Sequence, residues 1–346
     1  MVDEPGELVN FVAAIIATIT TPVPASPMMA KPDSNLCYGW VPEMICKACL
    51  SDGEHSRHIF VEMMFGTRER FEYQECIDCG TIQRLSEIAD ESRFYPSGYY
   101  SFTTPPRNSR LTAIRDAHAF GMKSVLGAVA SLVRYDPIVG VIGDFGIDPG
   151  SRVLDVGCGS ARLLHRMSAA GFKNLTGIDP YISKSASGTV TIHKSELQSM
   201  SGEFDFIMFN HSLEHVPDPD QSLGNARKLL APGGRILVRI PTSSSHAWME
   251  YGPNWVQLDA PRHIVIPSRK GMNALAKRCS LSVKQSIDDS TAFQFWGSEM
   301  YRRSKPLTSG PSDLFSRHEL RRFAKRAEKL NLEQQGDQVA FLLTAA

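Results

Sequence analysis

The segment from Arg152 to Pro180 restricts the fold more than any other part of the chain, because it reads as strand, glycine turn, helix and second strand. The run VLDV leads into the turn Gly157–Gly159, and such apolar runs form strands that are buried on both faces of a sheet. Glycine lets a backbone turn sharply and approach a ligand where a Cβ would collide. We expect Ser160 to cap the helix and Gly171 to end it. The segment therefore predicts an α/β unit that builds a nucleotide site.

The second strand of this unit, 175–178, ends at Asp179, twenty residues after Gly159. At this spacing the acid of a dinucleotide-binding fold reaches a ribose diol. The string GCGSAR lacks the third glycine of the dinucleotide fingerprint, however, and Asp155 before it would repel a pyrophosphate. The pattern therefore favours a cofactor that has a ribose and no diphosphate.

Two strings carry a resemblance to a known family. DVGCG followed by GID resembles the first two motifs of the class I S-adenosylmethionine-dependent methyltransferases, and LLAPGGRILVRIP resembles their fourth helix and fifth strand. The resemblance implies a Rossmann-like α/β fold whose sheet has seven strands, with the last strand, 338–343, antiparallel. It implies S-adenosyl-L-methionine as cofactor, with the ribose on Asp179 and the amino-acid end near Asp155. The implied cofactor-binding residues are Asp155, Gly157, Cys158, Gly159, Asp179 and Asn210. The alternative is a glycine turn in an unrelated α/β core.

The other elements continue the alternation of strands and helices. We expect strands at 189–192, 204–210 and 235–240, and a helix at 221–230. A helical stretch runs from about Leu111 to Arg134, and we expect one apolar face of it to cover the cofactor domain. The residues spaced for that face are Leu111, Ile114, Ala117, Phe120 and Val125.

Two C-x-x-C pairs precede this domain, and each pair is short enough for both thiolates to bind one ion. The four cysteines are Cys46, Cys49, Cys76 and Cys79. Their spacing, with room for a hairpin between the pairs, predicts a zinc ion (Zn2+) with four thiolate ligands. Such a site is structural, because it leaves no open coordination position for a reactant. Disulfides are the alternative, and His55 and His58 are possible substitute ligands.

The candidate catalytic residues follow the strand 204–210 in the string NHSLEHV. Ligands of open α/β sheets bind outside the carboxyl ends of the strands, which is where this string should lie. A histidine accepts a proton near neutral pH, so His215 is the first candidate for the base and His211 the second. Glu214 would orient a histidine or act as an alternative base. A different interpretation is that these residues only shape the cofactor pocket.

Candidate substrate residues lie in aromatic segments outside the motifs. Tyr99 and Trp255 offer stacking faces, although packing would equally explain them. Arg262 beside His263 could hold a phosphate or carboxylate, because arginine offers a two-pronged donor. We therefore name Tyr99, Trp255, Arg262 and His263 as substrate candidates.

The span from about 36 to 346 resembles a bacterial group of zinc-ribbon methyltransferases found among sugar and polysaccharide biosynthesis enzymes, related to the deoxysugar C-methyltransferases. Ser212 stands where those relatives have a tyrosine. The resemblance implies a small-molecule acceptor, namely a nucleotide-linked or lipid-linked sugar. The alternatives are a ribosomal RNA methyltransferase with a zinc module and a non-catalytic cofactor-binding protein. Equal numbers of basic and acidic residues, 37 each, disfavour a nucleic-acid partner.

Composition and motifs divide the chain into four parts. We expect a poorly ordered appendage at 1–35, a zinc-ribbon domain at 36–100, a helical linker or cover at 101–150, and a methyltransferase domain at 151–346. The apolar run 8–19 is too short to span a bilayer, and acidic residues precede it where an export signal would be basic. We therefore expect a cytoplasmic protein without a membrane span.

Overall fold

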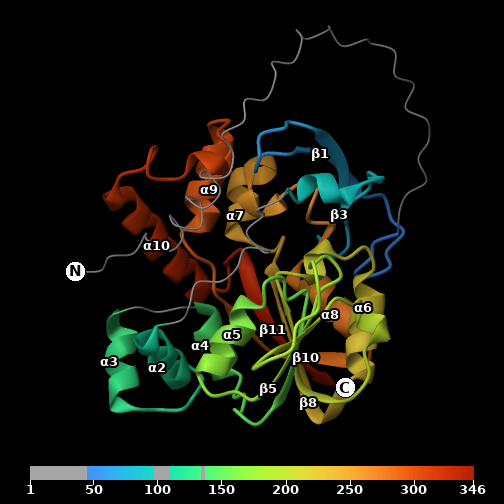
Figure 1. Cartoon of the computed structure of the whole chain (residues 1–346). Helices are drawn as coiled ribbons and strands as arrows, with labels where there is room; N and C mark the ends of the chain where they lie inside the picture. The colour runs from blue at the N-terminus through green and yellow to red at the C-terminus, as the bar shows by residue number, and fades with distance from the viewer. Residues whose placement is uncertain (1–44, 97–108, 134–136) are drawn as a thin grey trace, which may run out of the picture.

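The computed structural model describes residues 45–96, 109–133 and 137–346 (Figure 1). The expected appendage at 1–35 and the candidate Tyr99 lie outside these residues. The larger sheet has the order β10-β11-β8-β7-β4-β5-β6. Its strands are β4 (Arg152–Val156), β5 (Asn174–Ile178), β6 (Thr191–His193), β7 (Phe204–Asn210), β8 (Leu230–Pro241), β10 (Leu281–Asp288) and β11 (Gln338–Ala345). Strand β11 is antiparallel to both of its neighbours, which confirms the predicted seven-stranded sheet with an antiparallel last strand.

Both faces of this sheet are buried under helices. Successive strand residues point to opposite faces, so neighbouring residues of β4 join different apolar clusters. Val153 packs in a cluster with α4 (Pro137–Asp144) and α5 (Arg162–Ala169). Leu154 packs in a second cluster with α6 (Pro219–Lys228) and α8 (Arg269–Arg278). This explains why β4, β7 and β8 read as continuous apolar runs.

The expected single helix at 111–134 is wrong, because the chain forms α2 (Arg110–Ala119) and α3 (Val125–Val133). Gly121, with φ 96°, breaks the run between them. One helical period therefore does not continue through the break, and Leu111 and Val125 are 72% and 82% exposed instead of sharing a buried face. Helix α2 does pack on the part of the chain that carries the glycine turn, since Asp116 accepts a 2.7 Å hydrogen bond from Arg166 of α5.

Three local expectations also need correction. Ser160 does not cap α5, because Ala161 adopts a left-handed φ of 55° before the helix begins at Arg162 and no side chain caps it. The third strand lies at Thr191–His193, two residues later than expected at its start. Helix α6 starts earlier than expected, since Asp218 accepts a 2.9 Å hydrogen bond from Gln221 N and Pro219 fits the first helical position.

A second, four-stranded sheet lies beside the larger one, in the order β1-β2-β3-β9 (Figure 1). Its strands are β1 (Ser56–Val61), β2 (Arg70–Glu75), β3 (Ile82–Arg84) and β9 (Val265–Ile266). Strand β9 comes from the segment between β8 and α8, so the cysteine-bearing hairpins share a sheet with the part of the chain that forms the larger sheet. All its pairings are antiparallel, and we call it the mixed sheet only because its strands come from two distant parts of the chain. It packs with α7 (His246–Tyr251), α9 (Phe293–Arg302) and α10 (Arg317–Leu332).

Short 3-10 helices fill several connections. They are η1 (Glu91–Phe94), η3 (Leu197–Ser199), η4 (Leu213–His215), η5 (Gly252–Asn254), η6 (Val256–Leu258) and η7 (Leu307–Ser309). In the described part of the chain, no helix is long and apolar enough to cross a membrane.

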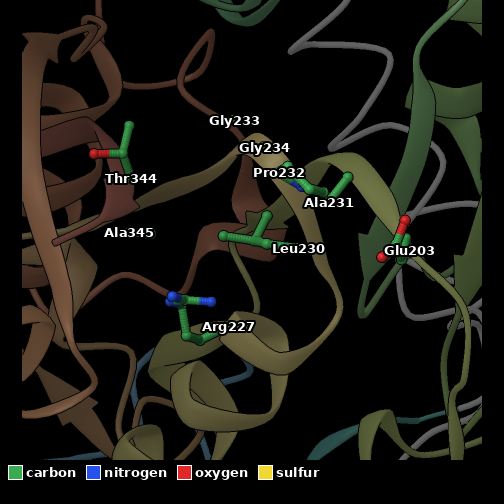
Figure 2. Close-up of a pocket in the computed structure, with 9 residues that line it drawn as sticks. All are labelled: Glu203, Arg227, Leu230, Ala231, Pro232, Gly233, Gly234, Thr344 and Ala345. Carbon is green, nitrogen blue, oxygen red and sulfur yellow. The ribbon is translucent and has the colours of Figure 1, made fainter.

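A surface hollow of about 470 Å³ lies where β8 begins and β11 ends (Figure 2). Its lining includes Arg227, Leu230 and Thr344. This is the edge of the sheet opposite the carboxyl ends of β4, β5 and β7. Cofactors of open α/β sheets bind at the carboxyl ends, so we do not assign this hollow to the cofactor.

Candidate functional site

The glycine turn lies at the carboxyl ends of the central strands. Gly157 and Gly159 adopt left-handed φ angles of 75° and 51°, which glycine reaches without strain. The N–H groups of Gly157 and Cys158 donate to the Ile178 carbonyl at 2.8 and 3.1 Å, which folds the turn over the end of β5. A Cβ at Gly157 would lie 2.5 Å from the Cβ of Ser212, after β7. The turn thus brings together the ends of β4, β5 and β7, where the sheet order reverses.

Two buried carboxylates face this turn. Asp179 accepts hydrogen bonds from Gly159 N at 3.0 Å and Tyr181 N at 2.8 Å, so its position at the end of β5 is defined. Asp155 is only 4% exposed, and burial, together with the charge of Asp179, raises its pKa to about 7. A ligand that brings hydroxyl donors and a positive charge would relieve this repulsion. S-adenosylmethionine fits, since its ribose supplies hydroxyls and its amino-acid end supplies an ammonium group.

The other two cofactor candidates face the protein. The Cys158 side chain packs over β5, where a Cβ at Gly177 would lie 2.7 Å from its Sγ. Burial raises the pKa of the Cys158 thiol, so it stays protonated. Asn210 accepts a 3.1 Å hydrogen bond from Arg239 of β8. Cys158 can therefore offer a cofactor its backbone, while the Asn210 oxygen is engaged by the neighbouring strand.

His215, at the end of η4, is held in a defined tautomer. Its Nδ1 lies 2.9 Å from the Arg262 carbonyl, which can only accept, so Nδ1 carries the proton and Nε2 is the basic atom. The Tyr95 hydroxyl lies 3.4 Å from the same Nδ1. Burial, and secondly the neighbouring His263, lower the pKa of His215 below the ordinary histidine value. The ring is therefore neutral, and able to accept a proton, at neutral pH.

Glu214 differs from His215 in being an ionised carboxylate. Burial pushes its pKa up, but the hydrogen bond with His211 and the charges of His215, His211 and His263 outweigh burial and lower the pKa to about 2. His211 Nδ1 lies 3.2 Å from Glu214 Oε1, and His211 has a left-handed φ of 53°. A carboxylate with so low a pKa is a weak base at neutral pH. The geometry therefore favours Glu214 as an orienting group.

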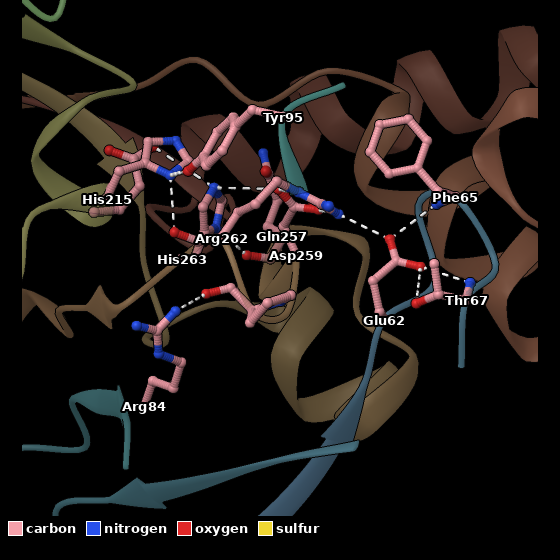
Figure 3. Close-up of polar contacts among 12 residues, drawn as sticks. Glu62, Phe65, Thr67, Arg84, Tyr95, His215, Gln257, Asp259, Arg262 and His263 are labelled. Carbon is pink, nitrogen blue, oxygen red and sulfur yellow. Dashed lines mark hydrogen bonds and ion pairs between the residues drawn. The ribbon is translucent and has the colours of Figure 1, made fainter. Parts of the chain in front are cut away.

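The three candidate substrate residues that the structure describes, Trp255, Arg262 and His263, have partners inside the protein. Trp255 is fully buried, and its Nε1 donates to Asp337 at 3.0 Å, which agrees with the packing alternative. Arg262 is 1% exposed, and its guanidinium pairs with Asp259 at 2.6 Å and Glu62 at 3.1 Å. His263 donates from Nδ1 to the Gln257 carbonyl at 2.7 Å. Figure 3 shows Arg262 between its two carboxylates and His263 beside His215.

Three residues that lie on or directly after strands of the mixed sheet reach this site, although the sequence analysis did not single them out. They are Glu62, Tyr73 and Arg84, and all three contact the segment 261–263. Glu62 is a fully buried charge directly after a strand. That combination signals an internal ion pair, but burial is not visible in the sequence.

The four cysteines of the two pairs come together as predicted. The Sγ atoms of Cys46 and Cys79 lie 3.6 Å apart, as do those of Cys49 and Cys76. Four sulfurs bound to one zinc at about 2.3 Å would lie about 3.8 Å from each other, whereas a disulfide needs about 2 Å. The spacing of the four sulfur atoms therefore fits a shared zinc ion and does not fit disulfides.

The two histidines considered as substitute zinc ligands have other partners. His55 Nε2 lies 3.2 Å from the Ser51 carbonyl, and its Nδ1 lies 3.5 Å from Ile77 N. His58 Nε2 lies 3.2 Å from Glu75. Both rings are therefore accounted for without the metal.

A second group of metal-binding residue types consists of Glu214, His215 and His263. His263 Nε2 and Glu214 Oε1 stand 4.0 Å apart. Ligands bound to one ion at about 2.1 Å in a tetrahedral site lie about 3.4 Å from each other, so this group would have to contract to bind one. The spacing therefore gives no reason to assign a second metal ion to this group.

Comparisons with known proteins agree with this arrangement. Residues 134–286 match the family model described as "Methyltransferase domain". A ubiquinone biosynthesis O-methyltransferase from Aromatoleum aromaticum is 36% identical over an alignment of 103 residues, which covers 25% of this chain and 43% of that enzyme. A protein of the same name from Pseudomonas aeruginosa is 27% identical over an alignment of 161 residues, which covers 40% of this chain and 67% of that enzyme.

Among solved structures, one from Thermotoga maritima is described as an S-adenosylmethionine-dependent methyltransferase and possible histamine N-methyltransferase. It aligns with a TM-score of 0.37 and 16% identity, over 68% of this chain and 90% of its own. The chain spans less than half of the Aromatoleum relative. The family match includes the glycine turn, Asp179 and η4. With the strand order of the sheet, it shows that this chain carries a methyltransferase domain of the class I, Rossmann-like type.

Proposed function

We propose that this protein transfers a methyl group from S-adenosylmethionine to a small-molecule acceptor. The observation that carries the proposal is the meeting of the glycine turn, the Asp155 and Asp179 pair, and η4 at the carboxyl ends of β4, β5 and β7. The family match supports the cofactor class. The two ubiquinone relatives are named O-methyltransferases, which favours oxygen as the acceptor atom.

In this proposal Asp179 binds the ribose hydroxyls, and Asp155 lies near the cofactor's ammonium group. Each Asp179 oxygen accepts one backbone N–H and keeps a lone pair for a hydroxyl. An ammonium group beside Asp155 would favour its ionised form and so lower the raised pKa. When bound, the cofactor supplies an electrophilic methyl group. The protein must then orient the acceptor and remove its proton.

His215 is the residue that we assign to the proton transfer. The acceptor oxygen would gain the methyl group as the methyl–sulfur bond of the cofactor breaks, with that electron pair left on the sulfur, and the acceptor O–H proton would move to His215 Nε2. The resulting imidazolium keeps its Nδ1–H bond to the Arg262 carbonyl. The ionised carboxylates Glu214 and Asp259 both favour the charged ring. Release of the proton to solvent then restores the base.

For the acceptor we propose a sugar-type hydroxyl, supported by the zinc-ribbon resemblance and the NHSLEH string. A ubiquinone precursor, which also offers a hydroxyl, is the second candidate because of the relatives' names. The test is uptake of labelled methyl groups from the cofactor into separate fractions of sugar nucleotides, lipid-linked sugars, phenolic precursors and RNA. Label in either of the first two fractions supports the sugar, and label in phenols alone selects the second candidate. Label in RNA alone, or in no fraction, contradicts small-molecule methyl transfer.

We also propose that Cys46, Cys49, Cys76 and Cys79 hold one structural zinc ion. Four thiolates complete a tetrahedral site and leave no position for a reactant. The metal would then act on the fold of residues 45–84 and on no bond of the acceptor.

A further inference from the structure

Hydrogen bonds and an ion pair connect the mixed sheet to the loop that contacts His215 (Figure 3). We call residues 259–264 the support loop. Arg84 Nη1 donates to the Pro261 carbonyl at 2.8 Å, and the Tyr73 hydroxyl donates to the His263 carbonyl at 2.9 Å. Between these two points, Arg262 is ion-paired with Glu62. Three consecutive loop residues are therefore each held by the mixed sheet.

The ion pair at the centre of these contacts is fully enclosed. The side chains of Arg262 and Glu62 are both 0% exposed. The Glu62 carboxylate is itself fixed, because Phe65 N and Thr67 N each donate to it at 2.9 Å. Asp259 completes the group by accepting two hydrogen bonds from Arg262, at 2.9 and 2.6 Å. Removing one member of such a group leaves an uncompensated buried charge, so its geometry is strongly specified.

The support loop in turn determines the position of His215. Its Arg262 carbonyl accepts a hydrogen bond from the Nδ1–H of His215, which leaves Nε2 as the basic atom. The Ile264 N–H donates to the Glu214 carbonyl at 2.7 Å, so the loop also holds the backbone of η4. A displacement of the loop would release both contacts. His215 could then rotate or change tautomer.

We propose that Glu62, Tyr73 and Arg84 are positioning residues for methyl transfer, acting through the support loop to hold His215 with Nε2 free to accept the acceptor's proton. The cysteine-bearing part of the chain then belongs to the catalytic apparatus as well as to the fold. This inference rests on the proposed role of His215. It adds residues that touch neither the cofactor nor the acceptor.

The test uses two variants with different risks to folding. Tyr73→Phe removes one hydroxyl and keeps the packing, whereas Glu62→Gln removes the buried charge and keeps the shape. Glu75→Gln is the matched control, since Glu75 lies on β2, pairs with His58 at 3.2 Å and does not contact the support loop. Displacement of reacting groups by about 1 Å lowers rates about 100-fold. We expect turnover to fall about 10-fold in Tyr73→Phe and about 100-fold in Glu62→Gln, with cofactor affinity and zinc content unchanged.

A pH profile separates positioning from a general loss of structure. Glu214, His263, Asp259 and Tyr95 face His215, His211 contacts Glu214, and the burial of His215 keeps its pKa low. A loosened loop admits water, so the acidic limb of the rate profile should move up toward the ordinary value of about 6.5. The Glu75→Gln control should keep the wild-type limb. Nitrogen NMR of His215 should show mixed tautomers in Glu62→Gln, and Glu62→Asp should partly restore the single tautomer.

The outcomes distinguish this inference from the proposed function. His215→Asn is measured in parallel. If His215→Asn loses turnover while both mixed-sheet variants keep wild-type rates and the wild-type limb, the positioning inference is wrong and the proposed function stands. If His215→Asn keeps full turnover, the assigned base itself is wrong. A rate loss in the mixed-sheet variants that only follows the fraction of unfolded protein, with the limb unchanged, also overturns the inference.

Discussion

Replacing His215 with asparagine tests the assignment of the base most directly. The asparagine amide can still donate to the Arg262 carbonyl, as Nδ1 does at 2.9 Å, but it has no atom that accepts a proton at neutral pH. A general base contributes about 10²–10⁴ to the rate. We expect turnover to fall by a factor in that range. Cofactor affinity should stay unchanged, because Asp155 and Asp179, the residues that we propose to bind the cofactor, belong to β4 and to the end of β5.

The pH dependence of the wild-type rate tests the assignment of His215 as the base independently. A base works in its deprotonated form, so the rate falls as the pH drops through the pKa of His215. Burial and His263 lower that pKa, so the acidic limb should lie below about 6.5, the value of an unperturbed histidine. The His215→Asn profile should lack this limb. Initial rates with labelled cofactor between about pH 5 and 9 measure both quantities.

His211→Asn is the matched control, since His211 is the neighbouring histidine and its Nδ1 lies 3.2 Å from Glu214. We expect it to keep the acidic limb. If instead His211→Asn loses the limb and His215→Asn keeps it, the roles are reversed. If His215→Asn loses cofactor affinity in proportion to its rate, measured by calorimetry, then His215 shapes the pocket and does not move the proton.

Three further variants test the cofactor and metal sites. Asp179→Ala should weaken binding of S-adenosylmethionine by about 2–3 kcal/mol, or tens to a hundredfold, and equal affinities by calorimetry would refute the ribose contact. Cys76→Ser should lower zinc below one ion per chain and expose residues 45–84 to protease while cofactor binding survives; wild-type protein without zinc by metal analysis would contradict the site. Asp155 has a raised pKa of about 7, so its ionisation removes stability as pH rises from about 4 through 7. The difference in melting temperature between Asp155→Asn and wild type should therefore increase in favour of the variant from pH 5 to pH 8. A difference that does not change with pH would argue against the raised pKa.

The sheet was predictable where burial imposes a pattern on consecutive residues. Strand β7 lies at Phe204–Asn210 as expected, because both of its faces are covered and its run is apolar. Strand β9 was not predicted, since two residues carry no periodic pattern and their partner, β3, is about 180 residues earlier. The break at Gly121 was missed because an apolar spacing can continue by chance across a turn.

In the site, too, residues within short motifs could be predicted, whereas contacts between residues far apart in the chain could not. The glycine turn, Asp179 and the η4 residues lie in short strings, so their place at the carboxyl ends of the strands could be expected from the sequence, and their chemical roles stay predictions. Arg262 was expected to hold a substrate anion, but its charge is already paired with Glu62 and Asp259 inside the protein. Glu62 lies 200 residues away from Arg262 in the chain. No local pattern reports whether an arginine meets its counter-charge in a ligand or in the fold.

The cysteine pairs are also joined to the larger sheet through α8. Lys270 donates to the Asp78 carbonyl at 2.6 Å, and Arg278 donates to the Ala48 carbonyl at 2.9 Å, so each turn that carries cysteines is held by this helix. The other face of α8 packs Met272 and Leu275 against the sheet that carries the glycine turn. Arg84 of β3 also holds the support loop, so we expect loss of zinc to lower turnover more than it weakens cofactor binding. Equal losses in the two measurements would contradict this expectation.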